Sequence, residues 1–195
     1  MFKEICFTEE WLKSFKRQAA HRRTDVIILE KMIYALHLLE QLQQNGLKFI
    51  FKGGTSLVLL LDEDNRFSID IDIISNTKKY ELETILTKVI DSSRFTGFKL
   101  NGHRSYKPGV PKAHYTFSYE SSIKGTYAGS VILDILIEDS PYPAITEKEI
   151  KAKWIETEDK TMVTVPIIDA ITGDKLTAFA PNTIGIPYEK GKREY

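Results

Sequence analysis

The chain has 195 residues, 42% of them hydrophobic and 28% charged, a composition typical of a folded globular domain rather than of a disordered or fibrous chain. Its 27 basic and 27 acidic residues cancel, so the net charge gives no indication of a nucleic-acid partner, and such a partner would need a local patch. Cys6 is the only cysteine, which excludes an internal disulfide and a cysteine-rich zinc site and fits a reducing compartment.

No segment of the sequence predicts export or membrane insertion. The start, Met-Phe-Lys-Glu, lacks the apolar core of a signal peptide, and the longest apolar run, residues 57–61, is far too short to span a bilayer. We therefore expect a cytoplasmic protein without a membrane partner.

Helices and short strands alternate in the first part of the chain. A helix is predicted over residues 8–19, with Thr8 as its N-cap, followed by a stronger helix over 25–45 that Gly46 ends. The apolar residues of the stronger helix recur at helical spacing: Leu29, Met32, Ile33, Leu36, Leu39 and Leu42. A strand over 47–51, a brief helix over 55–61, a polar turn over 62–65 and a strand over 66–75 are expected next.

The second part of the chain predicts a sheet flanked by helices. A helix is expected over 78–92, then strands over 96–100, 114–119 and 129–138. A capping-box pattern from Thr146 to Glu149 predicts the start of a helical turn, before a strand over 161–165 and a helix over 168–180 that Pro181 ends. Helices beside a mixed sheet indicate the α+β class, with α/β as the alternative.

Residues 51–73 combine a glycine turn with a pair of aspartates. Side chains alternate along a strand, so Asp70, Asp72 and Ser68 share one face while the intervening isoleucines face the core. The two aspartate Cα atoms lie about 6.6 Å apart in such a strand, a spacing from which two carboxylates can bind one divalent ion or two adjacent ions. The preceding Gly-Gly-Thr-Ser turn at 53–56 offers free N–H groups to a phosphate. The combination predicts metal-assisted phosphoryl chemistry.

A third acidic residue, Asp134, lies inside an otherwise apolar strand, Val131 to Ile137. Burying a carboxylate without a partner is costly, and a metal shared with Asp70 and Asp72 would supply that partner. The alternatives are an exposed position on an edge strand or a salt bridge to a lysine.

These motifs resemble the AbiEii/AbiGii and MenT-type toxins of the nucleotidyltransferase superfamily, over about residues 25–190. The family's glycine turn and Ser-x-Asp-x-Asp strand match Gly53, Gly54, Thr55, Ser56, Ser68, Asp70 and Asp72. Its later strand carboxylate matches Asp134, and its lysine-bearing helix matches Lys175. The resemblance implies one nucleotidyltransferase-like domain over 1–195, a mixed sheet flanked by helices. We expect the domain to lack the family's C-terminal helical region, because that region would begin near residue 195.

The resemblance also implies a mechanism. Mg²⁺ or Mn²⁺ ions bind Asp70, Asp72 and Asp134, while the glycine turn and Ser56 hold the phosphates of a nucleoside triphosphate and Lys175 adds positive charge. An acceptor hydroxyl attacks the α-phosphorus with help from Asp134, and pyrophosphate leaves. In the toxin relatives the acceptor is the 3′ end of tRNA, and a cognate antitoxin restrains the enzyme within a toxin–antitoxin or abortive-infection system.

Several neighbouring residues have two interpretations each. Lys52 could contact a phosphate or be a solvated lysine at a strand end, and Arg66 could contact a phosphate or pair with an acidic residue of the 62–65 turn. Ser68 could bind a ligand or cap a turn. His103 and His114 lack metal-ligand spacing and are expected to pack or to face water.

Three hypotheses of function stay open. The first is a nucleotidyltransferase toxin that modifies tRNA. The second is transfer to a small molecule, such as an aminoglycoside, or to a protein hydroxyl. The third is a catalytically silent nucleotide-binding module. The presence of all three carboxylates favours an enzyme, and a basic cluster within residues 13–23 mildly favours a polyanionic acceptor, although such clusters are usually solvated.

Overall fold

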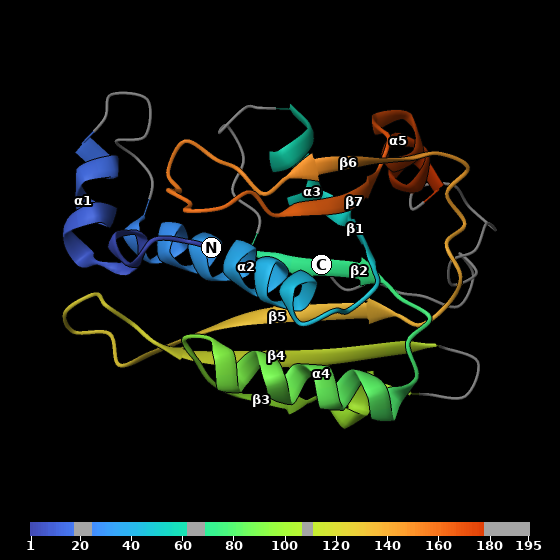
Figure 1. Ribbon diagram of the computed structural model, residues 1–195, viewed down its shortest axis with the longest axis horizontal. Coiled ribbons are helices and arrows are strands. Elements are labelled where there is room, and N and C mark those ends of the chain that lie inside the picture. Colours follow the sequence, from blue (N-terminus) through green and yellow to red (C-terminus); the bar gives the residue numbers. More distant parts are fainter. Residues whose placement is uncertain (18–24, 62–68, 107–110, 178–195) are drawn as a thin grey trace, which may run out of the picture.

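The computed structural model describes residues 1–17, 25–61, 69–106 and 111–177, and the main feature is a five-stranded mixed sheet (Figure 1). The strand order is β1-β2-β5-β4-β3, with β2 and β5 parallel and the other neighbours antiparallel. The strands are β1 (Ile50–Lys52), β2 (Asp70–Ile74), β3 (Phe95–Leu100), β4 (Lys112–Glu120) and β5 (Ala128–Leu136). The predicted mixed sheet is confirmed, and its two aspartate-bearing strands, β2 and β5, are interior neighbours.

Helices α2 (Val26–Gln44) and α4 (Lys79–Ser92) pack against one face of this sheet (Figure 1). The long apolar stripe that predicts α2 is buried, its first turn is capped by Asp25, which accepts a hydrogen bond from the Ile27 N–H at 2.9 Å, and Gly46 follows it with φ of +83°. The core therefore lies between these two helices and the sheet.

The alternation of the strands sorts apolar from polar side chains. On β5, Val131, Leu133 and Ile135 are buried in the core, so Asp134 between them lies on the opposite face. On β2, Ile71 and Ile73 are buried in the same way. The helix-covered face is thus apolar, and the predicted acidic residues gather on the other face.

A second, two-stranded sheet of β6 (Ile145–Glu149) and β7 (Met162–Pro166) lies beside β1, together with α3 (Gly53–Leu61) and α5 (Ile168–Thr177). The predicted helical turn at 146–149 is wrong, because these residues form β6 and pair with β7 in antiparallel register. Val163 and Val165 of β7 are fully buried, and pairing with β6 satisfies the backbone of this buried strand. Tertiary pairing therefore overrides the local capping signal.

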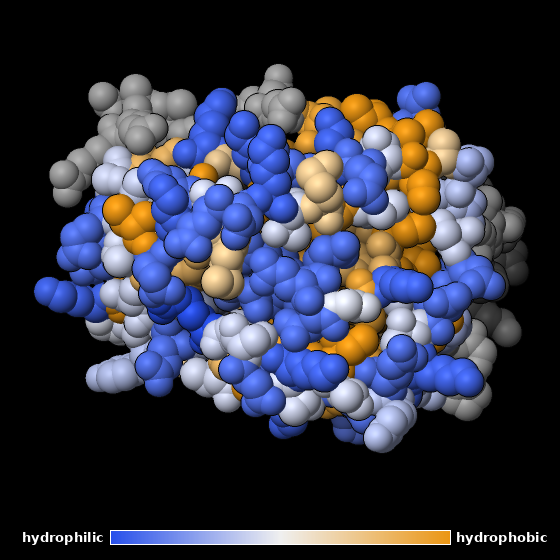
Figure 2. All heavy atoms as spheres, in the orientation of Figure 1, coloured by the Kyte–Doolittle hydropathy of each residue, from blue (hydrophilic) through white to orange (hydrophobic). Residues whose placement is uncertain are grey.

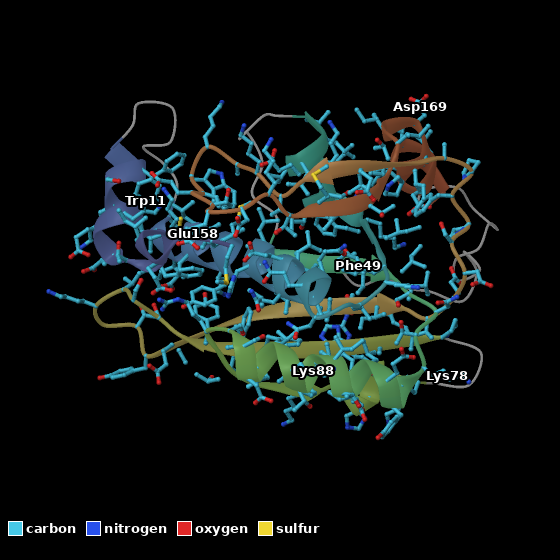
Figure 3. The ribbon with its side chains drawn as sticks, in the orientation of Figure 1. Trp11, Phe49, Lys78, Lys88, Glu158 and Asp169 are labelled. Carbon is cyan, nitrogen blue, oxygen red and sulfur yellow. The ribbon has the colours of Figure 1, made fainter. Side chains whose placement is uncertain are left out.

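The N-terminal segment comprises the 3₁₀-helix η1 (Glu4–Phe7) and α1 (Glu9–Arg17), and a further 3₁₀-turn, η3 (Gly102–Arg104), follows β3. The predicted N-cap is confirmed, since Thr8 Oγ1 accepts a hydrogen bond from the Trp11 N–H at 3.3 Å. Trp11, labelled in Figure 3, donates its indole N–H to the Trp154 carbonyl at 3.1 Å and so ties α1 to the segment before β7.

Parts of several predictions lie outside the described residues. These are Arg66 and Ser68, the basic residues at 21–23, the 62–65 turn and the last three positions of the helix predicted over 168–180. Within the described ranges, the strand predicted from 47 begins only at Ile50, and the helix predicted from 55 begins at Gly53.

The surface is mixed in character. Figure 2 shows hydrophilic side chains over most of the visible face and hydrophobic ones gathered over α5 and the β6–β7 sheet. The exposed apolar side chains of these elements include Ile145, Ile168 and Leu176. In the described part of the chain, no helix has the length and apolar character needed to cross a membrane.

Candidate active site

Four residues form a row across four adjacent strands on the polar face of the sheet. The register pairs Lys52 of β1 with Asp72 of β2, Asp72 with Asp134 of β5, and Asp134 with His114 of β4. Paired residues of neighbouring strands lie about 5 Å apart and project from the same face of the sheet. The row therefore places two carboxylates side by side between a lysine and a histidine.

The predicted aspartate pair of β2 is only partly in this row. Asp72 is half-buried, whereas Asp70 is exposed at the first position of β2 and pairs in register with Ile132. Alternation along β2 keeps Asp70 on the face of Asp72. The structure thus brings Asp70, Asp72 and Asp134 to one face, with Asp72 and Asp134 adjacent and Asp70 at its rim.

Gly53 packs directly against the Asp72 carboxylate. Its φ is +77°, a left-handed value that favours glycine, and a Cβ atom built there would lie 2.4 Å from Asp72 Oδ2. The first glycine of the turn is therefore needed both for the backbone conformation and for the space that the carboxylate occupies. Its predicted contact with a phosphate stays a prediction.

The hydroxyls of the glycine turn point inward. Thr55 Oγ1 donates a hydrogen bond to the Asp70 carbonyl at 2.6 Å, and Ser56 Oγ donates one to the Gly53 carbonyl at 2.8 Å. Both residues are fully buried, and Gly54 between Gly53 and Thr55 is half-buried. The Thr55 bond joins the start of α3 to β2, and the Ser56 bond closes the first turn of α3 at Gly53. The predicted role of Ser56 in binding phosphate stays a prediction.

Asp134 has a partner at each carboxylate oxygen. His114 Nδ1 lies 2.5 Å from Oδ1, and Lys112 Nζ lies 3.3 Å from Oδ2. The edge-strand alternative for Asp134 is wrong, because β5 is the central strand of the sheet, but the lysine salt bridge is present. Lys112 was not predicted as a site residue.

His114 is buried, in agreement with the expectation that it packs rather than faces water. Its contact with Asp134 was not predicted from the sequence. Alternation along the predicted strand 114–119 puts His114 on the polar face, which was the available signal. The connection between Glu120 and Ala128 is too long for the sequence to fix which β4 residue faces Asp134.

Like charges accumulate at Asp72. Burial raises the pKa of the Asp72 carboxyl, and the charges of Asp134 and Asp70 raise it further, while Lys52 and Lys112 oppose the shift. A site that buries carboxylates against one another is poorly suited to stabilising the fold and well suited to binding a cation.

Helix α5 meets the row at Lys52. Lys52 Nζ lies 3.7 Å from Asp174 Oδ2, and the Tyr142 hydroxyl donates a hydrogen bond to the same carboxylate oxygen. Burial raises the pKa of Tyr142, as do this hydrogen bond and the charges of Asp174 and Asp72. Lys52 is thus a paired residue rather than a solvated strand end, and sequence reasoning missed Tyr142 and Asp174.

Lys175 follows Asp174 on α5, and its side chain is exposed. Asp169, labelled in Figure 3, points away from the molecule, so α5 turns Asp174 rather than Asp169 toward Lys52. The predicted role of Lys175 toward a triphosphate stays a prediction.

The donor set fits a divalent cation held jointly with a substrate. Among residues 1–17, 25–61, 69–106 and 111–177, no three His, Cys, Asp or Glu side chains converge closely enough to hold a metal by themselves. Mg²⁺ is usually bound by one or two carboxylates together with substrate phosphates. The adjacent Asp72 and Asp134 supply such a carboxylate pair.

Two solved structures were found to be similar to this chain in their three-dimensional structure. MenT4, a nucleotidyltransferase toxin from Mycobacterium tuberculosis H37Rv, has 17% sequence identity and a TM-score of 0.56, with 86% of this chain and 58% of that one covered. JHP933 from Helicobacter pylori has 20% identity and a TM-score of 0.49, with 76% of this chain and 55% of that one covered. The chain spans just over half the length of these structures, and the MenT4 match shows a shared fold.

The comparison with curated proteins gives no match. The family model described as nucleotidyl transferase AbiEii toxin, type IV toxin–antitoxin system, matches residues 37–192. This match includes the glycine turn, the strands of all three carboxylates and α5. The chain therefore belongs to the AbiEii nucleotidyl transferase toxin family.

Proposed function

We propose that this chain is a metal-dependent nucleotidyltransferase that moves a nucleoside monophosphate from a nucleoside triphosphate to an acceptor hydroxyl. The observation that carries the proposal is the Asp72–Asp134 pair on adjacent parallel strands, with Gly53 packed against Asp72. Membership of the AbiEii family and the fold shared with MenT4 support the same chemistry.

The residues of the site have separate roles in this proposal. Asp72 and Asp134, with Asp70 at the rim, hold Mg²⁺ or Mn²⁺, which when bound would neutralise charge on the phosphoryl oxygens. Lys52 and Lys175 attract the triphosphate, and the backbone of the 53–56 turn binds its phosphates. The acceptor oxygen forms a bond to the α-phosphorus while the bond to pyrophosphate breaks, and Asp134 assists the loss of the hydroxyl proton.

The acceptor that we propose is the 3′ end of tRNA, and the partner is a cognate antitoxin. The family description, which names a toxin of a type IV toxin–antitoxin system, supports the antitoxin, and the tRNA acceptor rests on the resemblance to the toxins alone. The basic cluster contributes less support than the sequence suggests, because Lys13 pairs with Glu9 at 2.9 Å. Arg66 and Ser68, which lie outside the described residues, remain candidates for ligand contacts.

The decisive experiment incubates the protein with each labelled nucleoside triphosphate, Mg²⁺ and total tRNA, with Asp72→Asn as the inactive control. Label on tRNA that requires Asp72 supports the proposal. Label on a small molecule or on a protein would replace the acceptor, and tight nucleotide binding without any transfer would indicate a silent module.

The toxin assignment has its own test. Induced expression in a bacterial host is expected to arrest growth, and co-expression of the product of the adjacent gene is expected to relieve the arrest. Asp72→Asn at the same expression level is the matched control, and arrest by this variant would contradict a toxicity based on transfer.

A further inference from the structure

The two oxygens of Asp134 have partners of different kinds. Oδ1 faces the imidazole of His114 at 2.5 Å, and Oδ2 faces the ammonium group of Lys112 at 3.3 Å. Both partners come from β4, two residues apart on the same face of the strand. Because an ionised carboxylate only accepts hydrogen bonds, His114 donates through Nδ1–H.

His114 is held firmly in place. Its side chain is 4% exposed, and its backbone N–H donates to Ser105 Oγ at 2.9 Å while its carbonyl accepts from the Asn101 N–H at 2.9 Å. Breaking the contact with Asp134 would leave a buried donor unpaired, which is costly. The imidazole therefore fixes the orientation of the Asp134 carboxylate.

Lys112 is held less firmly. Its side chain is 34% exposed, at the first position of β4, and lysine has a long flexible stem. Its charge acts on Asp72 as well as on Asp134, since it opposes the rise in the pKa of Asp72. The ammonium group thus lies where its charge is shared by the two adjacent carboxylates.

We propose that His114 and Lys112 divide the two oxygens of Asp134. His114 is a positioning residue that holds Oδ1 permanently, and Lys112 is an exchangeable cation that a divalent ion displaces from Oδ2. This inference rests on the proposed function, because it concerns the same carboxylates. It predicts opposite signs for the loss of the two side chains. Removing His114 weakens metal binding because Asp134 loses its orientation, whereas removing Lys112 strengthens metal binding because a competitor is lost.

The test is a titration of the full chain with Mn²⁺ alone, in which electron paramagnetic resonance measures the concentration of free Mn²⁺ at each step. We expect His114→Leu to weaken Mn²⁺ binding by about 10- to 100-fold, the usual cost of losing a group that orients a metal ligand. His114→Asn, whose amide can donate from near the position of Nδ1, is expected to restore most of the affinity. Lys112→Gln is expected to strengthen binding by roughly two- to fivefold, the ratio that a partly exposed ion pair is worth.

Two control variants separate these effects from general ones. Lys99→Gln removes an exposed charge from β3 of the same sheet, and His37→Asn alters a buried histidine on α2 that lies among Phe2, Phe7 and Phe95. Both are expected to bind Mn²⁺ with wild-type affinity. If His114→Leu does not fold, the inference is still tested by Lys112→Gln, whose partly exposed position tolerates substitution, through the sign of its effect on the Mn²⁺ affinity.

The inference is overturned if Lys112→Gln leaves the Mn²⁺ affinity unchanged or lowers it, or if His114→Asn binds as weakly as His114→Leu. Those outcomes leave the proposed function intact, because its cation is held together with the triphosphate and the transfer assay tests it separately. If wild type and Asp72→Asn bind Mn²⁺ equally weakly, the carboxylate pair does not hold the ion by itself and the inference fails.

Discussion

In the part of the chain that the structure describes, two buried histidines each pair with a carboxylate, one in the core and one in the candidate active site. In the core, His37 Nδ1 lies 3.3 Å from Glu40 Oε2, one turn apart on α2. In the site, His114 of β4 meets Asp134 of β5. Both histidines are nearly inaccessible, so burial of the imidazole does not distinguish the two pairs.

The difference lies in the other neighbours of each carboxylate. Glu40 is surrounded by donors and rings: the Phe2 N–H reaches Glu40 Oε2 at 3.3 Å, and the His37 ring packs near Phe7 and Phe95. Burial would raise the pKa of Glu40, but the hydrogen bonds from His37 and the Phe2 N–H, together with the charges of His37 and of the N-terminal ammonium group 3.5 Å from Oε1, lower it overall. Asp134 instead adjoins Asp72, whose pKa is raised. The core carboxylate thus lies among groups that favour its charged form, whereas the site carboxylate lies beside a second acidic side chain.

Asp134→Asn is the variant with the largest expected effect. The amide still accepts a hydrogen bond from His114, but it lacks the charge that binds a cation, so we expect transfer to fall about a thousandfold or more. Weakening the hydrogen bond from His114 costs about 1–2 kcal/mol, and relief of the repulsion with Asp72 offsets part of this cost, so we expect only a small change in the free energy of unfolding. Single-turnover rates and urea unfolding measure the two quantities. If Asp134→Asn transferred at nearly the wild-type rate, the His114–Asp134 pair would have a structural role only, like the His37–Glu40 pair.

Gly53→Ala tests the same carboxylate through the backbone. The new methyl group would lie 2.4 Å from Asp72 Oδ2, and displacing a reacting group by about 1 Å can cost roughly a hundredfold in rate. Gly46→Ala is a matched control, because Gly46 also has a positive φ, +83°, but its added Cβ would meet no atom within 4 Å. Both variants are expected to lose about 1 kcal/mol of stability, and only Gly53→Ala is expected to lose transfer. Equal rates for the two would show that Asp72 tolerates displacement.

Glu40→Gln is the counterpart in the core. Replacing a charged acceptor by a neutral one weakens its hydrogen bonds with His37 and the Phe2 N–H, at an expected cost of about 1–2 kcal/mol in the free energy of unfolding. Transfer is expected to be unchanged at temperatures where the variant is folded, because Glu40 touches no residue of the row. A transfer defect in the fully folded variant would remove the distinction between the two regions.

The sequence predicts the strand-helix order and the aspartate face well because both depend on local periodicity. Asp70 and Asp72 share a face by the geometry of any strand, and the apolar stripe of α2 is visible without a partner. The β6 error shows the limit, since a capping box is a local signal and pairing with β7 is not. Local patterns therefore locate the secondary-structure elements but do not always tell a helix from a strand.

The partners within the site depend on register and on chain paths that periodicity does not contain. A carboxylate in an apolar run is unusual and marks Asp134 in the sequence, but His114 and Lys112 reach it only through the β4–β5 register. Tyr142 and Asp174 meet Lys52 because the segment before β6 and helix α5 both return to β1. No spacing along the chain indicates these contacts.

The smallest expected effect is a difference in sign between the two regions in the pH dependence of stability. The pKa of Glu40 is lowered from its ordinary value of 4.5, so Glu40 stabilises the fold above that pH and the contribution is lost as the pH falls through the lower folded value. The pKa of Asp72 is raised from 3.8, so the folded state binds its proton more tightly. Its stabilising contribution is therefore present below 3.8 and is lost as the pH rises through the folded value.

Urea unfolding without divalent ions, between about pH 3 and pH 7, measures both contributions, since each follows from a proton bound differently in the two states. The loss of stability in Glu40→Gln is expected to be largest at neutral pH and to shrink below pH 4.5. Asp72→Asn is expected to be more stable than wild type at neutral pH, with a gain that disappears toward pH 3.8. A loss of stability in Asp72→Asn at neutral pH would mean that Lys52 and Lys112 more than compensate the repulsion, and the site would then be a structural ion-pair network like the core pair.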